Sequence, residues 1–198
     1  MKNIVFDLGG VLFMRDPKKC TPEFIRFFSF VRQEQLPRFW NEYDRGTLTC
    51  DEAIDELCRL NGCDRSLAEQ YMQQAIDKQE PVPATEQLIR DLKAAGYRLY
   101  VLSNMSREFI AFLRRFPVYG RFDGEVVSCE EGVCKPEPAI YRLLLSRFGL
   151  DPAETLFIDD RADNIAAARA EGINGYRFDS HAPAASCEAL REQLLAGE

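Results

Sequence analysis

The sequence predicts an α/β protein in which a parallel β-sheet, covered by helices on both faces, is interrupted by a helical insert. Two observations lead to this fold class. From residue 84 onward, short apolar runs alternate with helical patterns, which is the order found in parallel sheets. Residues 15–83 hold helical patterns and no convincing strand. We therefore expect an α/β core from residues 1–14 and 84–198, with residues 15–83 forming a helical cap.

The expected strands are apolar runs that end in polar residues. The first, residues 3–6, reads NIVF and is followed by Asp7 and two glycines. Strands of a parallel sheet form such continuous apolar runs because both of their faces are buried. The other expected strands are residues 98–102, 124–128 and 155–158, with a weaker signal at 175–178.

Most of the expected core helices end at a glycine, a residue that readily adopts the left-handed conformation at a helix C-terminus. These core helices are residues 84–95, 107–115, 138–148 and 162–171, of which all but the second stop at a glycine. In the insert, helical patterns cover residues 22–32, 37–43, 50–60 and 65–78. Phe24, Phe27 and Phe28 follow the helical period, and we expect them in the core of the insert.

Composition indicates a globular protein and excludes several classes of partner. The 198 residues are 46% hydrophobic and 29% charged, which is not the composition of a disordered chain. A net charge of −7 gives no general attraction to nucleic acid or anionic lipid, so we expect neither nucleic acid nor a membrane as partner. Seven cysteines without metal-binding spacing indicate reduced thiols and a cytoplasmic location. The sequence carries no signal for the oligomeric state.

Polar side chains follow three of the expected strands. Asp7 follows the first strand, Ser103 and Asn104 follow the second, and Asp159 and Asp160 follow the fourth. Because ligands bind at the carboxyl ends of the strands in open α/β sheets, we expect these side chains to share one site.

A cation is needed where several buried carboxylates meet, because they repel one another. Lys135, in a turn just before the helix at 138–148, supplies one positive charge. Mg²⁺, which prefers oxygen ligands, would balance the two negative charges that remain. The metal and Lys135 together make a place for a dianion such as phosphate.

Four motifs occur in the order and at the spacing of a known family. They are FDLGGV at residues 6–11, LSN at 102–104, KPEP at 135–138 and FIDD at 157–160. On these motifs the chain resembles the haloacid dehalogenase (HAD) superfamily, in its branch with a helical cap after the first strand, and most of all its bacterial sugar-phosphate phosphatases. The resemblance covers essentially the whole chain. It implies a Rossmann-like core of the HAD type. It also implies a Mg²⁺-dependent phosphatase that acts through an aspartyl-phosphate on small phosphorylated metabolites, with sugar phosphates as candidate substrates.

The resemblance also implies catalytic and metal-binding residues. Asp7 is expected to be the nucleophile and a metal ligand, and Lys135 to stabilise the charge between Asp7 and the phosphoryl group. The backbone carbonyl of Gly9 and the carboxylate of Asp160 are the other expected protein ligands. Asp159 is expected to bind the metal directly or through a water molecule.

The residues expected to bind substrate come from both parts of the chain. By resemblance, Ser103, Asn104 and Lys135 bind the phosphoryl oxygens. Arg15, directly after the first strand, is placed to meet substrate when the cap closes. Trp40 and Arg45 lie close to a break at Gly46 and are candidates for contact with the organic group, although packing in the cap core is the stronger interpretation for Trp40.

One position departs from the family pattern. The family usually has a second Asp two residues after the nucleophile, which protonates the leaving oxygen and then activates water, and this chain has Gly9 there. Loss of such a group typically costs about 10²–10⁴-fold in rate. Either the leaving group is good enough to need no proton, as in an anomeric sugar phosphate or an acyl phosphate, or the cap supplies the acid. Asp16, Glu42 and Asp44 are candidates by residue type.

Two alternative functions stay open at this level. A dehalogenase of the same fold is compatible with Gly9, because a halide leaves without a proton from an acid. It also needs no metal, however, and the pair Asp159 and Asp160 is typical of a metal site. A non-catalytic phosphate-binding or regulatory protein is compatible with Gly9, because it would keep the metal and phosphate groups without turnover. Phosphate release from small phosphoesters, with and without Mg²⁺, separates these functions.

Overall fold

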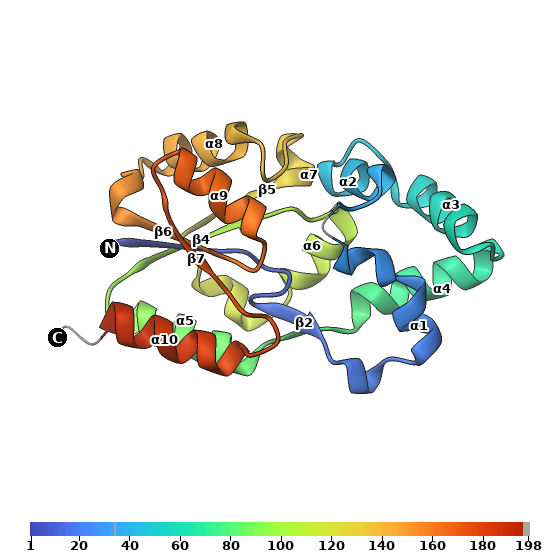
Figure 1. Cartoon of the computed structure of the whole chain (residues 1–198), viewed down its shortest axis with the longest axis horizontal. Coiled ribbons are helices and arrows are strands. Elements are labelled where there is room, and N and C mark those ends of the chain that lie inside the picture. The colour runs from blue at the N-terminus through green and yellow to red at the C-terminus, as the bar shows by residue number, and fades with distance from the viewer. Residues whose placement is uncertain (34, 196–198) are drawn as a thin grey trace.

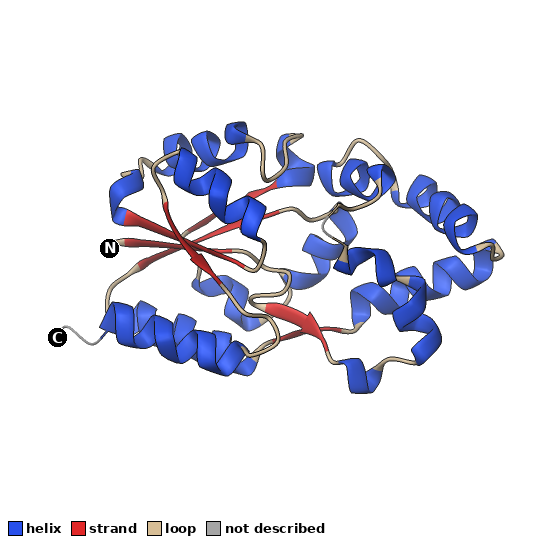
Figure 2. Cartoon of the chain, in the orientation of Figure 1, coloured by secondary structure: helices blue, strands red, loops and turns tan. Residues whose placement is uncertain are grey.

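A five-stranded parallel sheet forms the centre of the core, as the sequence predicts (Figure 2). In this computed structural model, which describes residues 1–33 and 35–195, the strand order is β5-β4-β1-β6-β7. The strands are β1 (Asn3–Phe6), β4 (Arg98–Ser103), β5 (Gly124–Val127), β6 (Thr155–Asp159) and β7 (Asn174–Arg177). All neighbouring pairs are parallel, so the carboxyl end of β1 is flanked by those of β4 and β6.

Helices cover both faces of the sheet, because successive side chains of a strand point to opposite sides. Ile4 and Phe6 share one hydrophobic cluster with α5 (Pro83–Ala94) and α10 (Pro183–Leu195). Val5, between them, belongs to a second cluster with α8 (Pro138–Phe148) and α9 (Ala162–Ala170). Figure 1 shows these two helix layers on either side of the sheet.

The inserted segment is helical and lies beyond the carboxyl ends of the strands, at the opposite end of the molecule from the N-terminus (Figure 1). Its helices are α1 (Pro22–Phe27), α2 (Arg38–Arg45), α3 (Cys50–Asn61) and α4 (Arg65–Asp77), with 3₁₀ turns η1 (Pro17–Lys19) and η2 (Ser29–Arg32). Aromatic side chains fill its interior, among them the expected Phe24, Phe27 and Phe28. Phe109, from α6 (Arg107–Leu113) of the core, joins the same cluster.

The connection between insert and core differs from the sequence expectation. β2 (Phe13–Arg15) and β3 (Gln79–Pro81) pair antiparallel, so the chain enters and leaves the insert through one two-stranded ribbon. The sequence predicts no strand between residues 15 and 83, because a three-residue strand that ends in proline has no recognisable alternation. The division at residues 15 and 83 itself stays a prediction.

The remaining elements are short or were not foreseen from the sequence. The C-terminal helix α10 is absent from the expected elements, since its apolar residues follow the helical period only weakly. The short elements are α7 (Ser128–Glu131) and the 3₁₀ turns η3 (Pro117–Arg121) and η4 (Pro152–Glu154). No helix among the described residues is both long enough and apolar enough to span a membrane.

The C-terminal end of α2 is docked on the core beside α7. The hydroxyl of Ser128 donates a hydrogen bond to the backbone carbonyl of Asp44. Gly46 follows with φ +80°, and a Cβ there would lie 2.5 Å from the backbone oxygen of Cys129. Glycine at this position therefore permits both the left-handed end of α2 and its close approach to α7.

Replacing Gly46 with alanine is expected to destabilise the protein more than the same change at Gly62. Both glycines end cap helices, with φ of +80° and +62°, so each alanine costs about 1 kcal/mol in backbone strain. Only at Gly46 does the added methyl group also collide with Cys129, because Gly62 has no atom within 4 Å of its Cβ position. We expect an additional loss of about 1–3 kcal/mol in the free energy of unfolding, measured with urea. Equal losses would show that α2 is not held against α7.

Candidate active site

Asp7 stands directly after β1, and three donors surround one of its carboxylate oxygens. Its Oδ1 accepts hydrogen bonds from the backbone N–H of Leu8 at 2.7 Å and from the hydroxyl of Ser103 at 2.8 Å. The Nζ of Lys135 lies 2.9 Å from the same oxygen. In the described part of the chain no donor binds Oδ2, so this second oxygen is free for a ligand or for attack.

Lys135 is a buried cation that joins two carboxylates. Its side chain is 1% exposed, and its Nζ lies 2.9 Å from Asp7 and 2.7 Å from Asp159. Burial alone would lower the pKa of Lys135, but the charges of Asp159 and Asp7 raise it above its ordinary value. The side-chain amide of Asn104 fixes the backbone of Lys135, accepting from its N–H at 2.7 Å and donating to its carbonyl at 2.8 Å.

The two carboxylates after β6 have different surroundings. Asp159 is fully buried, and both of its oxygens accept hydrogen bonds from Asn164, at 3.1 and 3.0 Å, besides the contact of one with Lys135. Asp160 instead lines a cavity. Gly10 makes room for it, since a Cβ there would overlap the Asp160 carboxylate. The structure thus presents Asp160 to a ligand and uses Asp159 to hold Lys135.

Three carboxylates meet at this point. Asp7, Asp159 and Asp160 each offer an oxygen atom within 4.8 Å of the others. Burial raises the pKa of Asp7 to about 7. The positive charge of Lys135 lowers this pKa, and the negative charges of Asp159 and Asp160 raise it further. Burial, and then the charge of Asp159, raise the pKa of Asp160 to about 6.

This donor set fits the metal that the sequence implies. Crowded carboxylates with raised pKa values, and a single ammonium to offset them, are typical of a site that takes a divalent cation. All of the side-chain donors are oxygens, which suits Mg²⁺. Gly9 also lines the cavity, as do Asp7 and Asp160. The ligand assignment of Asp7, Gly9, Asp159 and Asp160 stays a prediction.

A cavity of about 710 Å³ opens over these groups, with walls from both the core and the inserted helices. Its polar end contains the groups described above, namely Asp7, Gly9, Asn104, Lys135 and Asp160. The rest of the wall combines apolar side chains with the polar side chains of Arg15, Gln35, Asn41 and Gln79; the apolar ones are Met14, Phe24, Ile25, Phe28, Val31, Leu36 and Trp40. The cavity therefore has room for an anionic group beside Asp7 and Lys135 and for an organic group beside the insert.

The substrate residues predicted from the sequence lie at different places. Asn104, Arg15 and Trp40 line the cavity. Ser103 is fully buried beneath it and donates to the carboxylate of Asp7. Trp40 also packs among the cap aromatics, with its ring centroid 6.1 Å from that of Phe28, so the core-packing and the substrate-contact interpretations are compatible. The binding roles of these residues stay predictions.

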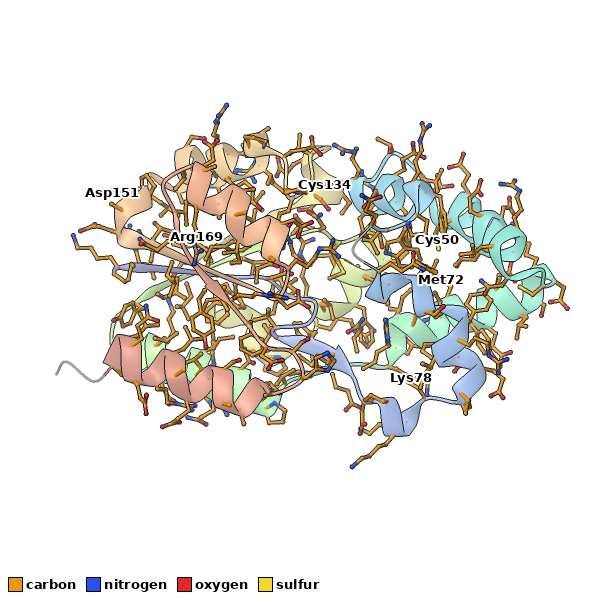
Figure 3. All side chains as sticks on the ribbon, in the orientation of Figure 1. Cys50, Met72, Lys78, Cys134, Asp151 and Arg169 are labelled. Carbon is orange, nitrogen blue, oxygen red and sulfur yellow. The ribbon has the colours of Figure 1, made fainter. Side chains whose placement is uncertain are left out.

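Arg45 is placed elsewhere. It is not among the described residues that line the cavity. Its Nη2 lies 2.5 Å from a carboxylate oxygen of Glu137, and its Nη1 donates to the backbone carbonyl of Gly132 at 3.0 Å. Figure 3 shows Cys134, from the same loop, next to α2. In this geometry Arg45 joins the insert to the loop that carries Lys135, and its predicted contact with the organic group stays untested.

Several cavity residues have no local signal in the sequence. Phe24 and Phe28 are core residues by their spacing, yet both also border the cavity. Ser180 and His181, which follow β7, contribute to the wall although an isolated histidine in a loop predicts no role. Asp44 is one of three candidate acids by residue type, and only the folded insert places it at the cavity.

Known proteins resemble this chain in sequence and in fold. A model of haloacid dehalogenase-like hydrolases matches residues 1–172. The sesquiterpene phosphatase astK of Aspergillus oryzae is 28% identical over 96% of this chain and 95% of its own. The D-ribitol-5-phosphate phosphatase of Bacteroides thetaiotaomicron is 27% identical over 92% and 94%. The structure of the HAD family enzyme bt-2542 from the same bacterium, in complex with magnesium and inorganic phosphate, matches with a TM-score of 0.71 and 26% identity, over 91% of this chain and 95% of its own. This chain therefore belongs to the haloacid dehalogenase-like hydrolases.

Proposed function

We propose that this chain is a Mg²⁺-dependent phosphatase that hydrolyses small phosphomonoesters through an aspartyl-phosphate on Asp7. The observation that carries the proposal is the position of Asp7 at the polar end of the cavity, with Lys135 at 2.9 Å and two further carboxylates nearby. Relatives named as phosphatases and a neighbour that binds magnesium and phosphate support it. The carboxylate cluster favours this function over a dehalogenase, which needs no metal.

The residues of the site have distinct tasks in this reaction. Leu8, Ser103 and Lys135 hold Oδ1 of Asp7, which leaves Oδ2 to attack phosphorus. The P–Oδ2 bond forms while the bond to the leaving alcohol breaks, and water then cleaves the aspartyl-phosphate. Lys135 offsets the negative charge that carboxylate and phosphoryl group bring together. Mg²⁺, when bound, supplies further positive charge and orients a phosphoryl oxygen.

Asp7→Asn is expected to lower phosphate release more than about a thousandfold, because it removes the nucleophile. Asp77→Asn, which changes an exposed carboxylate of α4, serves as the matched control and is expected to leave the rate unchanged. The measurement is release of inorganic phosphate from a panel of phosphoesters. Asp7→Asn activity within threefold of the unaltered protein would exclude Asp7 as the nucleophile.

Mg²⁺ is expected to raise the midpoint of thermal unfolding, and more so at about pH 8 than at about pH 5. The pKa of Asp7 is raised from 3.8 to about 7, so the metal-free folded protein holds more protons than the unfolded chain between these pH values. Its stability therefore falls as the pH rises through this window, because the carboxylates become charged and repel. Mg²⁺ offsets that repulsion but competes with protons at low pH.

Asp160→Asn provides the control for this measurement. It removes a charge that faces the cavity, and we expect it to abolish most of the Mg²⁺-dependent increase in the unfolding midpoint. An increase that is equal at both pH values, or that survives Asp160→Asn, would contradict a metal site at these residues.

We further propose that the organic part of the substrate is apolar. Six aromatic and aliphatic side chains of the insert line the cavity and outnumber its amide side chains there, which are Gln35, Asn41 and Gln79; the six are Phe24, Ile25, Phe28, Val31, Leu36 and Trp40. A buried hydroxyl without a partner costs about 1–3 kcal/mol, whereas an apolar chain gains free energy on the same surface. Among the relatives, the name sesquiterpene phosphatase supports this class of ester, whereas the name D-ribitol-5-phosphate phosphatase supports a polar one.

Leu36→Asn is expected to lower kcat/KM for an apolar ester such as geranyl phosphate about tenfold, because it removes one apolar contact. For glucose 6-phosphate, kcat/KM should change less than threefold. Leu36 is half-buried on the cavity wall, and the control Leu60→Asn changes a side chain that is 52% exposed and outside the cavity. Equal effects on both esters, or a higher kcat/KM for the sugar phosphate in the unaltered protein, would exclude the apolar class.

A further inference from the structure

The site lacks a group that a phosphatase ordinarily uses. The position two residues after Asp7 is Gly9, which has no side chain to give a proton to the leaving oxygen. A Cβ added at Gly9 would have no atom within 4 Å, so this position faces open space in the cavity. A proton donor must come from elsewhere, or the reaction must proceed without one.

Only one of the three candidate acids of the insert reaches the cavity. Asp16 caps η1 by accepting from the backbone N–H of Lys18 at 2.9 Å, and it does not line the cavity. Glu42 pairs at the surface with Arg38, at 2.7 Å, and does not line it either. Asp44 lines the cavity together with Asp7 and is buried, with 9% of its surface exposed.

The core holds Asp44 in place from two sides. The backbone N–H of Ser106, at the start of α6, faces its carboxylate and lowers the pKa of that group. Its backbone carbonyl accepts from the hydroxyl of Ser128, at the start of α7. The next residue, Arg45, is paired with Glu137. The docking of α2 beside α7 thus fixes the Asp44 carboxyl group relative to the core (Figure 1).

We propose that Asp44 is the general acid and base of the reaction and replaces the side chain that Gly9 lacks; this inference rests on the proposed phosphatase function. In the first step Oδ2 of Asp7 bonds to phosphorus, the bond from phosphorus to the leaving oxygen breaks, and the Asp44 carboxyl group gives its proton to that oxygen. In the second step the Asp44 carboxylate takes a proton from water as water attacks phosphorus. The P–Oδ2 bond breaks, and inorganic phosphate and protonated Asp44 result.

The surroundings of Asp44 favour its protonated form. Burial raises its pKa to about 7, with Asp7 adding to this effect and Lys135 opposing it. The thiols of Cys129 and Cys134 also face this carboxyl group, and burial raises their pKa values to about 11, so they carry no charge at neutral pH. An acid with a pKa near the working pH is the most effective for proton transfer.

The test compares Asp44→Asn with Glu42→Gln on two substrates. For hexyl phosphate, whose alcohol leaves poorly, Asp44→Asn should lower kcat/KM about 10²–10⁴-fold. For 4-nitrophenyl phosphate kcat/KM should change less than threefold, because this phenol leaves without a proton. Its kcat should fall, with a burst of nitrophenol, because the aspartyl-phosphate then lacks a base. Glu42→Gln, on the same helix but outside the cavity, should leave kcat and kcat/KM unchanged for both substrates.

Gly9→Asp gives a second test that does not depend on the folding of Asp44→Asn. If Asp44 is the acid, Gly9→Asp alone should raise kcat/KM for hexyl phosphate less than threefold, and it should restore much of the loss when combined with Asp44→Asn. A large gain from Gly9→Asp alone would mean that the chain has no acid.

Two results would overturn the inference while leaving the phosphatase function intact. One is an unchanged kcat/KM for hexyl phosphate in Asp44→Asn. The other is an equal loss of kcat/KM for hexyl phosphate and for 4-nitrophenyl phosphate, which indicates a structural role. Failure of the unaltered protein to hydrolyse any phosphoester would instead reject the proposed function itself.

Discussion

The rest of the structure depends on the buried ion pairs of Lys135. The Lys135 side chain is 1% exposed, and its ammonium contacts Asp7 and Asp159, which follow or end the neighbouring strands β1 and β6. A buried charge without its partner is costly by several kcal/mol, so neither strand end is free to move away from the other. Asn104, after β4 on the other side of β1, fixes the backbone of Lys135. The centre of the sheet and the proposed catalytic groups therefore satisfy one electrostatic requirement.

That requirement is only partly met by the protein itself. Three carboxylates face a single ammonium, and the imbalance appears as the raised pKa values of Asp7 and Asp160. A proton or a divalent cation is needed to complete the balance, and oxygen ligands select a hard cation. Asp159 shares its oxygens with Lys135 and Asn164, whereas Asp160 faces the cavity. The same excess charge that destabilises the empty site thus favours a cation at the point where a phosphoryl group would bind.

The features that the sequence predicts are those with a local cause. Apolar runs predict the parallel strands, glycines predict the helix ends, and strand ends predict that Asp7, Asp159 and Asp160 meet. The β2–β3 ribbon could not be predicted, because pairing of two three-residue segments more than 60 residues apart depends on tertiary structure alone. For the same reason residue type could not rank Asp16, Glu42 and Asp44. Their difference is burial, and burial follows from the docking of α2 on α7.

The placement of an acid on α2 has a consequence for the order of events. A carboxyl group on the first strand would stand beside Asp7 at all times, whereas Asp44 is in place only while α2 lies against α7. Gly46 permits that contact, and the Arg45–Glu137 pair spans it. The insert also carries most of the apolar wall that we expect to hold the organic group of the substrate. An ester that contacts this wall would therefore stabilise the docked state, and with it the position of Asp44, the proposed proton donor. Binding free energy from a group remote from phosphorus would then act on the chemical step, which is how remote contacts raise kcat.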